Sequence, residues 1–195
     1  GNMLDRRAFI FGWAAAATTI FPSSIAIAQS KKPRKPFVLD PRFKPQVVSY
    51  TGYSAGTIVI ETSNHFLYLM LSDTEALRYG IGVGKAGLAF RGAAIIGRKA
   101  KWPTWRPTDS MIARSPEKYA RFAGGMPGGA KNPLGARALY LYRNDRDTLY
   151  RIHGTTEPSS IGKSVSNGCI RMINDHVIDL YQRVPVGASV IVKAR

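Results

Sequence analysis

The sequence contains a single cysteine, Cys169, among its 195 residues. A lone thiol cannot form an internal disulfide, so it is either a small buried apolar residue or a group kept for chemistry. Gly168 before it and Arg171 after it favour chemistry. Glycine allows a substrate to approach the backbone closely, and a nearby cation stabilises a thiolate. We therefore interpret Cys169 as a nucleophile.

Other chemical motifs are scarce as well. The sequence has no glycine-rich phosphate-binding loop and no Cys-x-x-Cys pair, and its only imidazoles are His65, His153 and His176. A metal site built from these residues would need carboxylates at spacings that the sequence does not show. We expect no metal and no cofactor, and we expect His65 and His176 to be solvated residues without a role.

Acidic residues are few. Twelve Asp and Glu stand against 28 Lys and Arg, which gives a formal net charge of +16 at pH 7. The basic residues are spread from Lys31 to Arg195 rather than gathered in one arm. Such a field favours polyanionic partners: nucleic acid, anionic lipid or an acidic wall polymer. Charge alone does not choose among these three.

The N-terminal residues indicate export. A twin-arginine run, Arg6-Arg7, leads into an uncharged stretch that ends with the small-x-small pattern of residues 26–28. We expect residues 1–28 to be a signal peptide of the twin-arginine route, the protein to be periplasmic, and nucleic acid not to be a partner. The alternative is an uncleaved anchor, since the stretch is about long enough to span a bilayer. Pro22 and the Ala-x-Ala ending favour cleavage, which leaves no stable membrane span.

The remaining chain predicts one folded domain. Residues 29–54 are rich in Lys, Arg and Pro and predict an extended linker, followed by a catalytic domain over residues 55–195. Seven strand-like runs cover residues 57–60, 66–71, 78–83, 92–96, 137–142, 149–152 and 189–193. One late helix is expected, with Asn174 as its cap and Asp175 in its first turn. The prediction is a mostly β domain, a sandwich or barrel with a late helix and a long loop insertion.

The insertion covers residues 97–136 and contains Trp102 and Trp105. About forty residues of loop-like sequence in a compact domain are usually functional or disordered. Two tryptophans argue against disorder, which leaves two interpretations. The segment is an ordered covering over a groove, or both indoles plug one end of the sandwich or barrel.

A free thiol needs an adjacent base, and His153 at the end of a predicted strand is the candidate. The other ring nitrogen of His153 needs an acceptor, either Glu157 or a backbone carbonyl such as that of Gly154. The backbone N–H groups of Gly168 and Cys169 are candidates for an oxyanion hole. Arg171 stabilises a thiolate or grips a substrate carboxylate, and Ser166 hydrogen-bonds to the site or to a substrate amide. The structural alternatives for these two residues are a surface ion pair and a turn hydroxyl.

These residues resemble a known family. Ile152-His153-Gly154-Thr155 and residues 166–172, with the sequence Ser-Asn-Gly-Cys-Ile-Arg-Met, are similar to the motif of the L,D-transpeptidase catalytic (YkuD-like) family. The Asn-Pro-Leu-Gly run at residues 132–135 is similar to that family too. In a common form of the motif a histidine precedes Gly-Cys, whereas this chain has Asn167. The role of a second imidazole is therefore missing, but the pair His153 and Cys169 is intact.

The resemblance implies a β-rich fold and cysteine-dependent acyl transfer on peptidoglycan stem peptides, with Ser166, Asn167, Gly168 and Arg171 around the substrate. It also implies acylation by carbapenems. The acceptor of the acyl group would be a neighbouring stem peptide, a lipoprotein lysine, a free D-amino acid or water. Two alternatives remain open: the same chemistry on another periplasmic polymer, and a non-catalytic wall-binding module.

Overall fold

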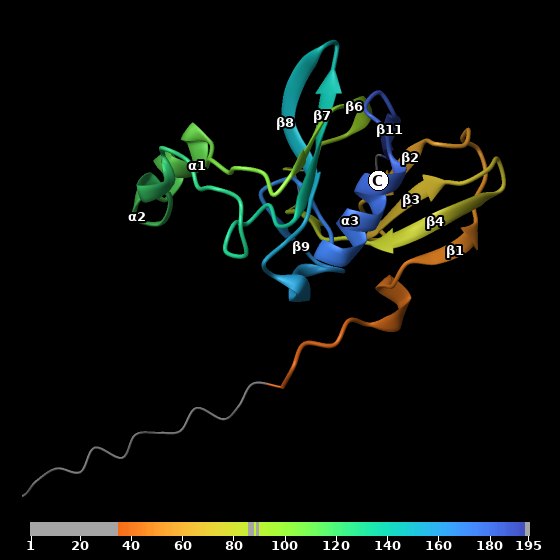
Figure 1. The fold of residues 1–195 in the computed structure, drawn as a ribbon, viewed down its shortest axis with the longest axis horizontal. Helices are drawn as coiled ribbons and strands as arrows, with labels where there is room; N and C mark the ends of the chain where they lie inside the picture. The colour runs from red at the N-terminus through yellow and green to blue at the C-terminus, as the bar shows by residue number, and fades with distance from the viewer. Residues whose placement is uncertain (1–34, 86–87, 89, 194–195) are drawn as a thin grey trace, which may run out of the picture. The chain divides into compact units, whose positions relative to one another are not determined.

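The computed structural model describes residues 35–85, 88 and 90–193, and most of their regular structure is β-strand (Figure 1). In this part of the chain, nine strands form one sheet in the order β1-β4-β3-β2-β11-β6-β7-β8-β10, and β5 pairs with β9. The strands are β1 (Gln46–Ser49), β2 (Ile58–Glu61), β3 (Phe66–Met70), β4 (Glu75–Gly80), β5 (Val83–Gly84), β6 (Gly92–Lys101), β7 (Arg137–Arg143), β8 (Arg146–His153), β9 (Ser164–Ser166), β10 (Ile170–Arg171) and β11 (Ser189–Val192). The mostly β prediction is confirmed.

The helices are few and short. They are α1 (Asp109–Arg114), α2 (Pro116–Tyr119) and α3 (Asn174–Arg183), with 3-10 turns η1 (Pro41–Phe43), η2 (Ala120–Phe122) and η3 (Pro158–Ser160). Figure 1 shows α1 and α2 set apart from the sheet, on the side of β7 and β8. No helix among the described residues is long and apolar enough to cross a membrane. The predicted signal peptide, residues 1–28, lies outside the described residues.

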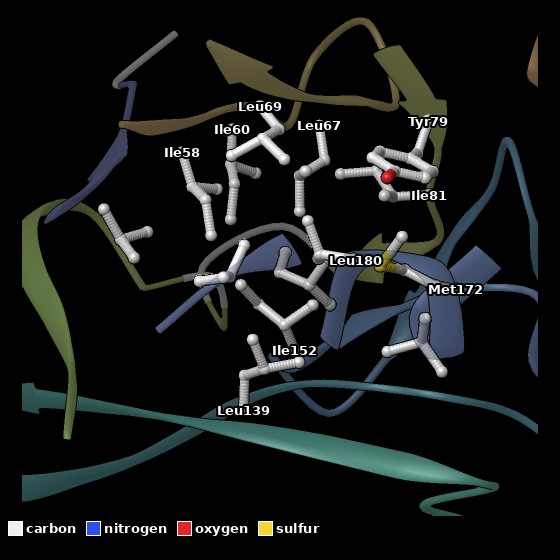
Figure 2. Close-up of a cluster of buried hydrophobic side chains, with 14 of the residues drawn as sticks. Ile58, Ile60, Leu67, Leu69, Tyr79, Ile81, Leu139, Ile152, Met172 and Leu180 are labelled. Carbon is white, nitrogen blue, oxygen red and sulfur yellow. The ribbon is translucent and has the colours of Figure 1, made fainter. Parts of the chain in front are cut away.

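The main core lies between two parts of the large sheet and α3. Figure 2 shows Ile60 of β2 and Leu67 of β3 on one side, Leu139 of β7 and Ile152 of β8 on the other, and Leu180 of α3 between them. All five are fully buried. Burying a side chain of this size contributes about 1.5–3 kcal/mol. This core holds β8, the strand that carries the predicted base, at a fixed place.

The strand predictions hold with one exception. β-Branched and aromatic residues form β2 and β3, and a turn with positive φ at both Asn144 and Asp145 joins β7 to β8. The predicted strand over residues 78–83 is only partly right, because β4 covers Glu75–Gly80 and a separate strand, β5, begins at Val83. β6 extends to Lys101, so the insertion begins later than predicted.

The folded part also begins earlier than residue 55. Gln46–Ser49 forms β1 and pairs antiparallel with β4, from Gln46 opposite Arg78 to Ser49 opposite Glu75. Phe43 is buried and contacts the ring of Phe66. The predicted linker over residues 29–54 therefore overlaps the sheet. The basic composition of this segment did not indicate a strand. The short edge strand is fixed instead by backbone pairing with β4 and by the burial of Phe43.

The late helix is confirmed, but its predicted cap is wrong. Ile173 occupies the N-cap, and Asp175 lies in the first turn as expected. The Asn174 side chain is used elsewhere: its amide oxygen accepts the N–H groups of Ala136 and Thr155, and its amide nitrogen donates to the Thr155 carbonyl. Asn174 thus joins the residues just before β7 to those just after β8.

Residues 102–136, which we call the covering segment, are ordered by polar contacts and by an aromatic cluster. The buried side chain of Asn132 donates to the carbonyls of Pro103, Met126 and Pro127 and accepts the Leu134 N–H. These bonds hold the two ends of the segment together.

The aromatic residues of the covering segment decide between its two interpretations. Trp105 packs against Tyr119 and Phe122 of the same segment, and Trp102 is 50% exposed. The interpretation that both indoles plug the domain is therefore wrong. The segment is an ordered covering.

Candidate active site

Parallel pairing of β8 with β10 brings His153 and Cys169 to one face of the sheet. Ile170 pairs with Ile152 and Arg171 pairs with His153. Both isoleucines are buried in the core. Because successive side chains of a strand point to opposite faces, the residues that alternate with them, including His153 and Cys169, belong to the opposite face. The predicted base at the end of β8 and the predicted nucleophile, which immediately precedes β10, are therefore on the same side of the sheet.

His153 is buried and held in one tautomer. Its Nδ1 donates to the carbonyl of Gly154 at 2.5 Å, so the neutral ring keeps Nε2 as a proton acceptor. Burial lowers the pKa of His153 to about 4; the Gly154 hydrogen bond raises it, and the charges of Arg171 and Arg151 lower it further. The expected orienting role of the Gly154 carbonyl matches this contact. His153 is thus a neutral imidazole at pH 7.

Cys169 is held as a thiol rather than a thiolate. Burial raises the pKa of the Cys169 thiol, while the Arg151 N–H and the charges of Arg151 and Arg171 oppose the rise. The Arg171 charge favours the thiolate, as expected, but burial outweighs it and the pKa of the thiol is raised. In the described structure the thiol donates to the Leu149 carbonyl at 3.9 Å and not to His153.

Arg171 and Glu157 form a pair of their own. Arg171 Nη1 lies 2.6 Å from Glu157 Oε2, with the Arg171 side chain 21% exposed and that of Glu157 64% exposed. Glu157 is therefore not the acceptor for the imidazole. The Glu157 carboxylate holds the guanidinium of Arg171. The alternative prediction for Arg171, an ion pair, is therefore confirmed.

The cysteine loop, residues 166–169, is closed by Ser166. Its hydroxyl donates to the Cys169 carbonyl at 2.7 Å and accepts the Gly168 N–H at 3.2 Å. The turn-hydroxyl alternative for Ser166 is confirmed. The Gly168 N–H thus has Ser166 as its partner in this structure, and its place in an oxyanion hole stays a prediction. The backbone N–H of Cys169 stays a candidate for that role.

Gly168 is required by its surroundings. Its φ is +128°, and a Cβ there would collide with the Leu88 carbonyl and the Tyr150 ring. Glycine at this position was predicted to let a substrate approach the backbone. In the structure the groups that approach it are Leu88 and Tyr150 of the protein itself. Asn167 beside it is exposed and lines a groove with Cys169.

That groove has a volume of about 1030 Å³ and lies between the sheet and the covering segment. Cys169 and Asn167 line one part of it, and Trp105, Arg106 and Met126 line another. His153 is only 6% exposed and is not among the groove-lining residues of the described chain. A substrate in the groove therefore meets the thiol, whereas the imidazole is buried and does not line the groove.

Sequence reasoning missed a bulge in β8 next to the thiol. The register shifts between Tyr140 and Tyr142 of β7, and Leu149 opposite them has a φ of +65°. A bulky residue in this conformation is uncommon and is often held in place at functional sites. The Asp147 carboxylate accepts the Leu149 N–H at 2.8 Å and also binds the guanidinium of Arg151. The bulge depends on the register of β8 against β7, for which the local sequence carries no signal.

The other two histidines differ from expectation. His65 Nε2 lies 3.0 Å from the Ser164 hydroxyl, on the strand that leads into the cysteine loop. His176 is partly buried, and its buried Nδ1 has no hydrogen-bond partner among the described residues. Burial lowers the pKa of His176, although Asp175 and Asp179 oppose this. Both histidine side chains are partly buried, so the prediction that they are solvated is wrong. Among the described residues, no three side chains of the metal-binding types cluster.

A family model and related sequences indicate one family. Residues 55–192 match the family model described as the L,D-transpeptidase catalytic domain, YkuD. The chain is 35% identical over 136 residues to the probable L,D-transpeptidase ErfK/SrfK of Escherichia coli, a match that covers 68% of this chain and 42% of that protein. The chain thus spans less than half the length of this relative.

Solved structures share the fold. A Brucella melitensis crystal structure named as a probable carnitine operon oxidoreductase is 55% identical, with a TM-score of 0.57, and the match covers 80% of this chain and 96% of that one. L,D-transpeptidase 3 of Mycobacterium tuberculosis is 15% identical, with a TM-score of 0.51 over 77% of this chain and 62% of that one. At that identity the likeness shows the fold alone.

Proposed function

This chain belongs to the L,D-transpeptidase catalytic domain family, and from that premise we propose that it transfers peptidoglycan stem peptides through a thioester on Cys169. The observation that carries the proposal is the parallel pairing of β8 with β10, which places His153 at the end of β8 and Cys169 just before β10 on one face, with the thiol lining a groove. Family membership makes the chain an enzyme of this class. The nucleophile, the substrate and the location are our proposal.

The first half-reaction starts from the neutral pair. The Cys169 thiol leaves the Leu149 carbonyl, gives its proton to Nε2 of His153, and its sulfur bonds to the carbonyl carbon of the third stem residue. The tetrahedral intermediate collapses as the C–N bond to the terminal D-alanine breaks. That amine takes the proton from His153 and leaves, and the acyl group stays on sulfur as a thioester.

The second half-reaction restores the enzyme. An amine acceptor gives a proton to Nε2 of His153 and attacks the thioester carbonyl, and the sulfur leaves and takes the proton back. A neighbouring stem peptide, a lipoprotein lysine or a free D-amino acid would serve as acceptor, and water would give a shortened peptide. The Gly154 carbonyl keeps the imidazole in the tautomer that both steps need.

The proposal includes a periplasmic location and export by the twin-arginine route, supported by Arg6-Arg7 and the small-x-small pattern of residues 26–28. It also includes acylation of Cys169 by carbapenems, since an activated carbonyl in the groove meets the same thiol. The oxidoreductase name of the Brucella structure has no counterpart among the motifs of this sequence, which has no glycine-rich phosphate-binding loop.

The test is product analysis on a defined wall fragment. The full chain is incubated with a disaccharide-tetrapeptide, alone and with added D-amino acids, and the products are identified by mass spectrometry beside Cys169→Ala. A crosslinked dimer, an exchanged terminal residue or a tripeptide in the wild type alone supports the proposal and identifies the acceptor. A folded wild type that forms none of these products would contradict it.

A further inference from the structure

Three neighbouring strands and the residue just before β10 place four side chains in one row that ends at the thiol. Arg98 of β6 pairs with Tyr140 of β7, and Tyr140 pairs with Arg151 of β8. The pairing of Ile170 with Ile152 puts Cys169, one residue earlier, beside Arg151. Residues directly opposite each other on paired strands project to the same face. The row therefore runs across the wall of the groove, and all four of its residues line that groove.

A bulge directs Arg98 into this row. The register of β6 against β7 shifts between Ile96 and Arg98, around Gly97. A Cβ on Gly97 would collide with the ring of Tyr142, so only glycine fits this bulge. Bulges commonly change the direction of a side chain next to a functional site. The result here is that Arg98 comes into register with Tyr140.

The ring of Tyr140 carries two guanidinium groups. The Arg98 Cζ lies 3.7 Å from the ring centroid, and the Arg151 Cζ lies 4.4 Å from it. Stacking on an aromatic ring fixes a guanidinium in place while leaving its N–H edge able to bind an anion. Tyr140 itself is buried, with 5% of its surface exposed, so the platform is rigid.

The two arginines differ in how their charge is balanced. Arg151 makes a bidentate ion pair with Asp147. The same carboxylate accepts the Leu149 N–H and so stabilises the bulge. Arg98 makes no ion pair with any described residue and is exposed. Arg171, predicted from sequence to grip a substrate carboxylate, is held by Glu157. Within the row, Arg98 is the arginine without a direct carboxylate contact among the described residues, although its charge lowers the pKa of Asp147.

We propose that Arg98 is a carboxylate-binding residue for the donor peptide. The proposal rests on the function proposed above and names the substrate feature that the groove recognises. Tyr140 is two strand spacings from Cys169, about 10 Å. Two residues of extended peptide span about 7 Å and a hydrogen bond adds about 3 Å, so a guanidinium there reaches a carboxylate that lies about two residue lengths from the reacting carbonyl. The terminal D-alanine carboxylate and the side-chain carboxylate of the third residue share this chemistry.

The first experiment measures anion selectivity at the thiol without any transpeptidation. Cys169 is alkylated with iodoacetate and with iodoacetamide, and the ratio of the two rates is compared across variants. Arg98→Gln should lower the ratio several-fold at low salt, Arg98→Lys should keep most of it, and Arg146→Ala should leave it unchanged. Arg146 is exposed and does not line the groove. An unchanged ratio in a folded Arg98→Gln protein would overturn the proposal.

The second experiment uses donor tetrapeptides. Arg98→Gln should raise the KM for the donor about tenfold with little change in kcat, as expected for loss of one charge-assisted contact. Amidating the carboxylate that Arg98 binds should raise the wild-type KM equally and add nothing in the variant. Terminal and side-chain amides tested separately identify which carboxylate it is, and a KM effect that both amides add to the variant would contradict the assignment.

The two experiments separate failure of this proposal from failure of the proposed function. A wild type that shows Arg98-dependent anion selectivity but forms no wall product contradicts the peptidoglycan substrate and supports the carboxylate site. If the wild type forms wall products but Arg98→Gln changes neither the KM nor the alkylation ratio, the peptidoglycan substrate is supported and the carboxylate site is contradicted. Arg114 also lines the groove without a described carboxylate partner. Because it lies on α1 outside the row, Arg114→Ala should change the ratio less than Arg98→Gln does.

Discussion

The carboxylate of Asp147 accepts the backbone N–H of Leu149 at 2.8 Å and thereby holds a leucine with a φ of +65° beside the reactive thiol. The Leu149 carbonyl in turn accepts the Cys169 thiol at 3.9 Å. The same carboxylate binds Arg151, whose backbone N–H faces the sulfur. One acidic side chain therefore sets the backbone on which the resting thiol lies.

Asp147→Ala is expected to destabilise the protein by about 1–3 kcal/mol, because it leaves the Leu149 N–H and Arg151 without their partner. The rate of Cys169 alkylation should change as well, since the thiol loses its fixed backbone neighbour. Urea unfolding and iodoacetamide labelling measure the two effects. Asp73→Ala, at an exposed residue, is the control. Equal stability and labelling in Asp147→Ala and Asp73→Ala would show that the bulge does not depend on Asp147.

His153 should make the fold sensitive to mild acid. Its pKa is about 4 in the folded protein and near 6.5 when unfolded, so between these values the unfolded chain binds more protons. The stability that His153 contributes is complete above about pH 6.5 and is lost as the pH falls toward 4. Between pH 7 and pH 5 the wild type should lose about 2 kcal/mol more than His153→Gln does. Equal losses in urea titrations of the two proteins would contradict the low pKa.

Cys169 should be a thiol at pH 7. Burial raises its pKa, so the ultraviolet absorbance of a thiolate, measured as wild type minus Cys169→Ala, should be absent at neutral pH. It should grow only above the ordinary thiol value of about 8.5. A thiolate band at pH 7 that disappears near pH 4 would instead show a thiolate–imidazolium ion pair and would require the reaction to start from ions.

Gly168→Ala should destabilise the protein by about 1–3 kcal/mol and slow catalysis. The added Cβ would meet the Leu88 carbonyl and the Tyr150 ring at a φ of +128°. Gly124→Ala is the matched control, since no atom lies within 4 Å of a Cβ there. Thermal unfolding of both variants makes the comparison, and a Gly168→Ala protein as stable as the control would mean that the cysteine loop moves aside freely.

Much of the fold was predictable because local patterns and tertiary packing agree. Alternating and β-branched runs predicted β2, β3 and β7, and a turn at Asn144-Asp145, two residue types common in turns, joins β7 to β8. β1 was missed, since its pairing with β4 depends on backbone bonds to a strand about thirty residues away rather than on its own composition. Asn174 was misassigned because the partners of its side chain, Ala136 and Thr155, come from other elements.

The site was predictable in its chemistry and less so in its arrangement. The motif identified His153 and Cys169, and the Gly154 carbonyl was among the expected partners of the imidazole. The competing role of Ser166 in closing the cysteine loop was an open alternative that only geometry resolves. The row from Arg98 to Cys169 was not visible at all, because it depends on two bulges and on the register of four strands.

The most direct test of the account is intact-protein mass spectrometry of the full chain during turnover of a disaccharide-tetrapeptide, followed by peptide mapping. The account predicts an adduct with the mass of the acyl group that remains after loss of D-alanine. The adduct should map to Cys169, be labile to hydroxylamine as thioesters are, and be absent from Cys169→Ala. Wall products formed while Cys169 stays unmodified and replaceable by alanine would contradict the nucleophile on which the whole account depends.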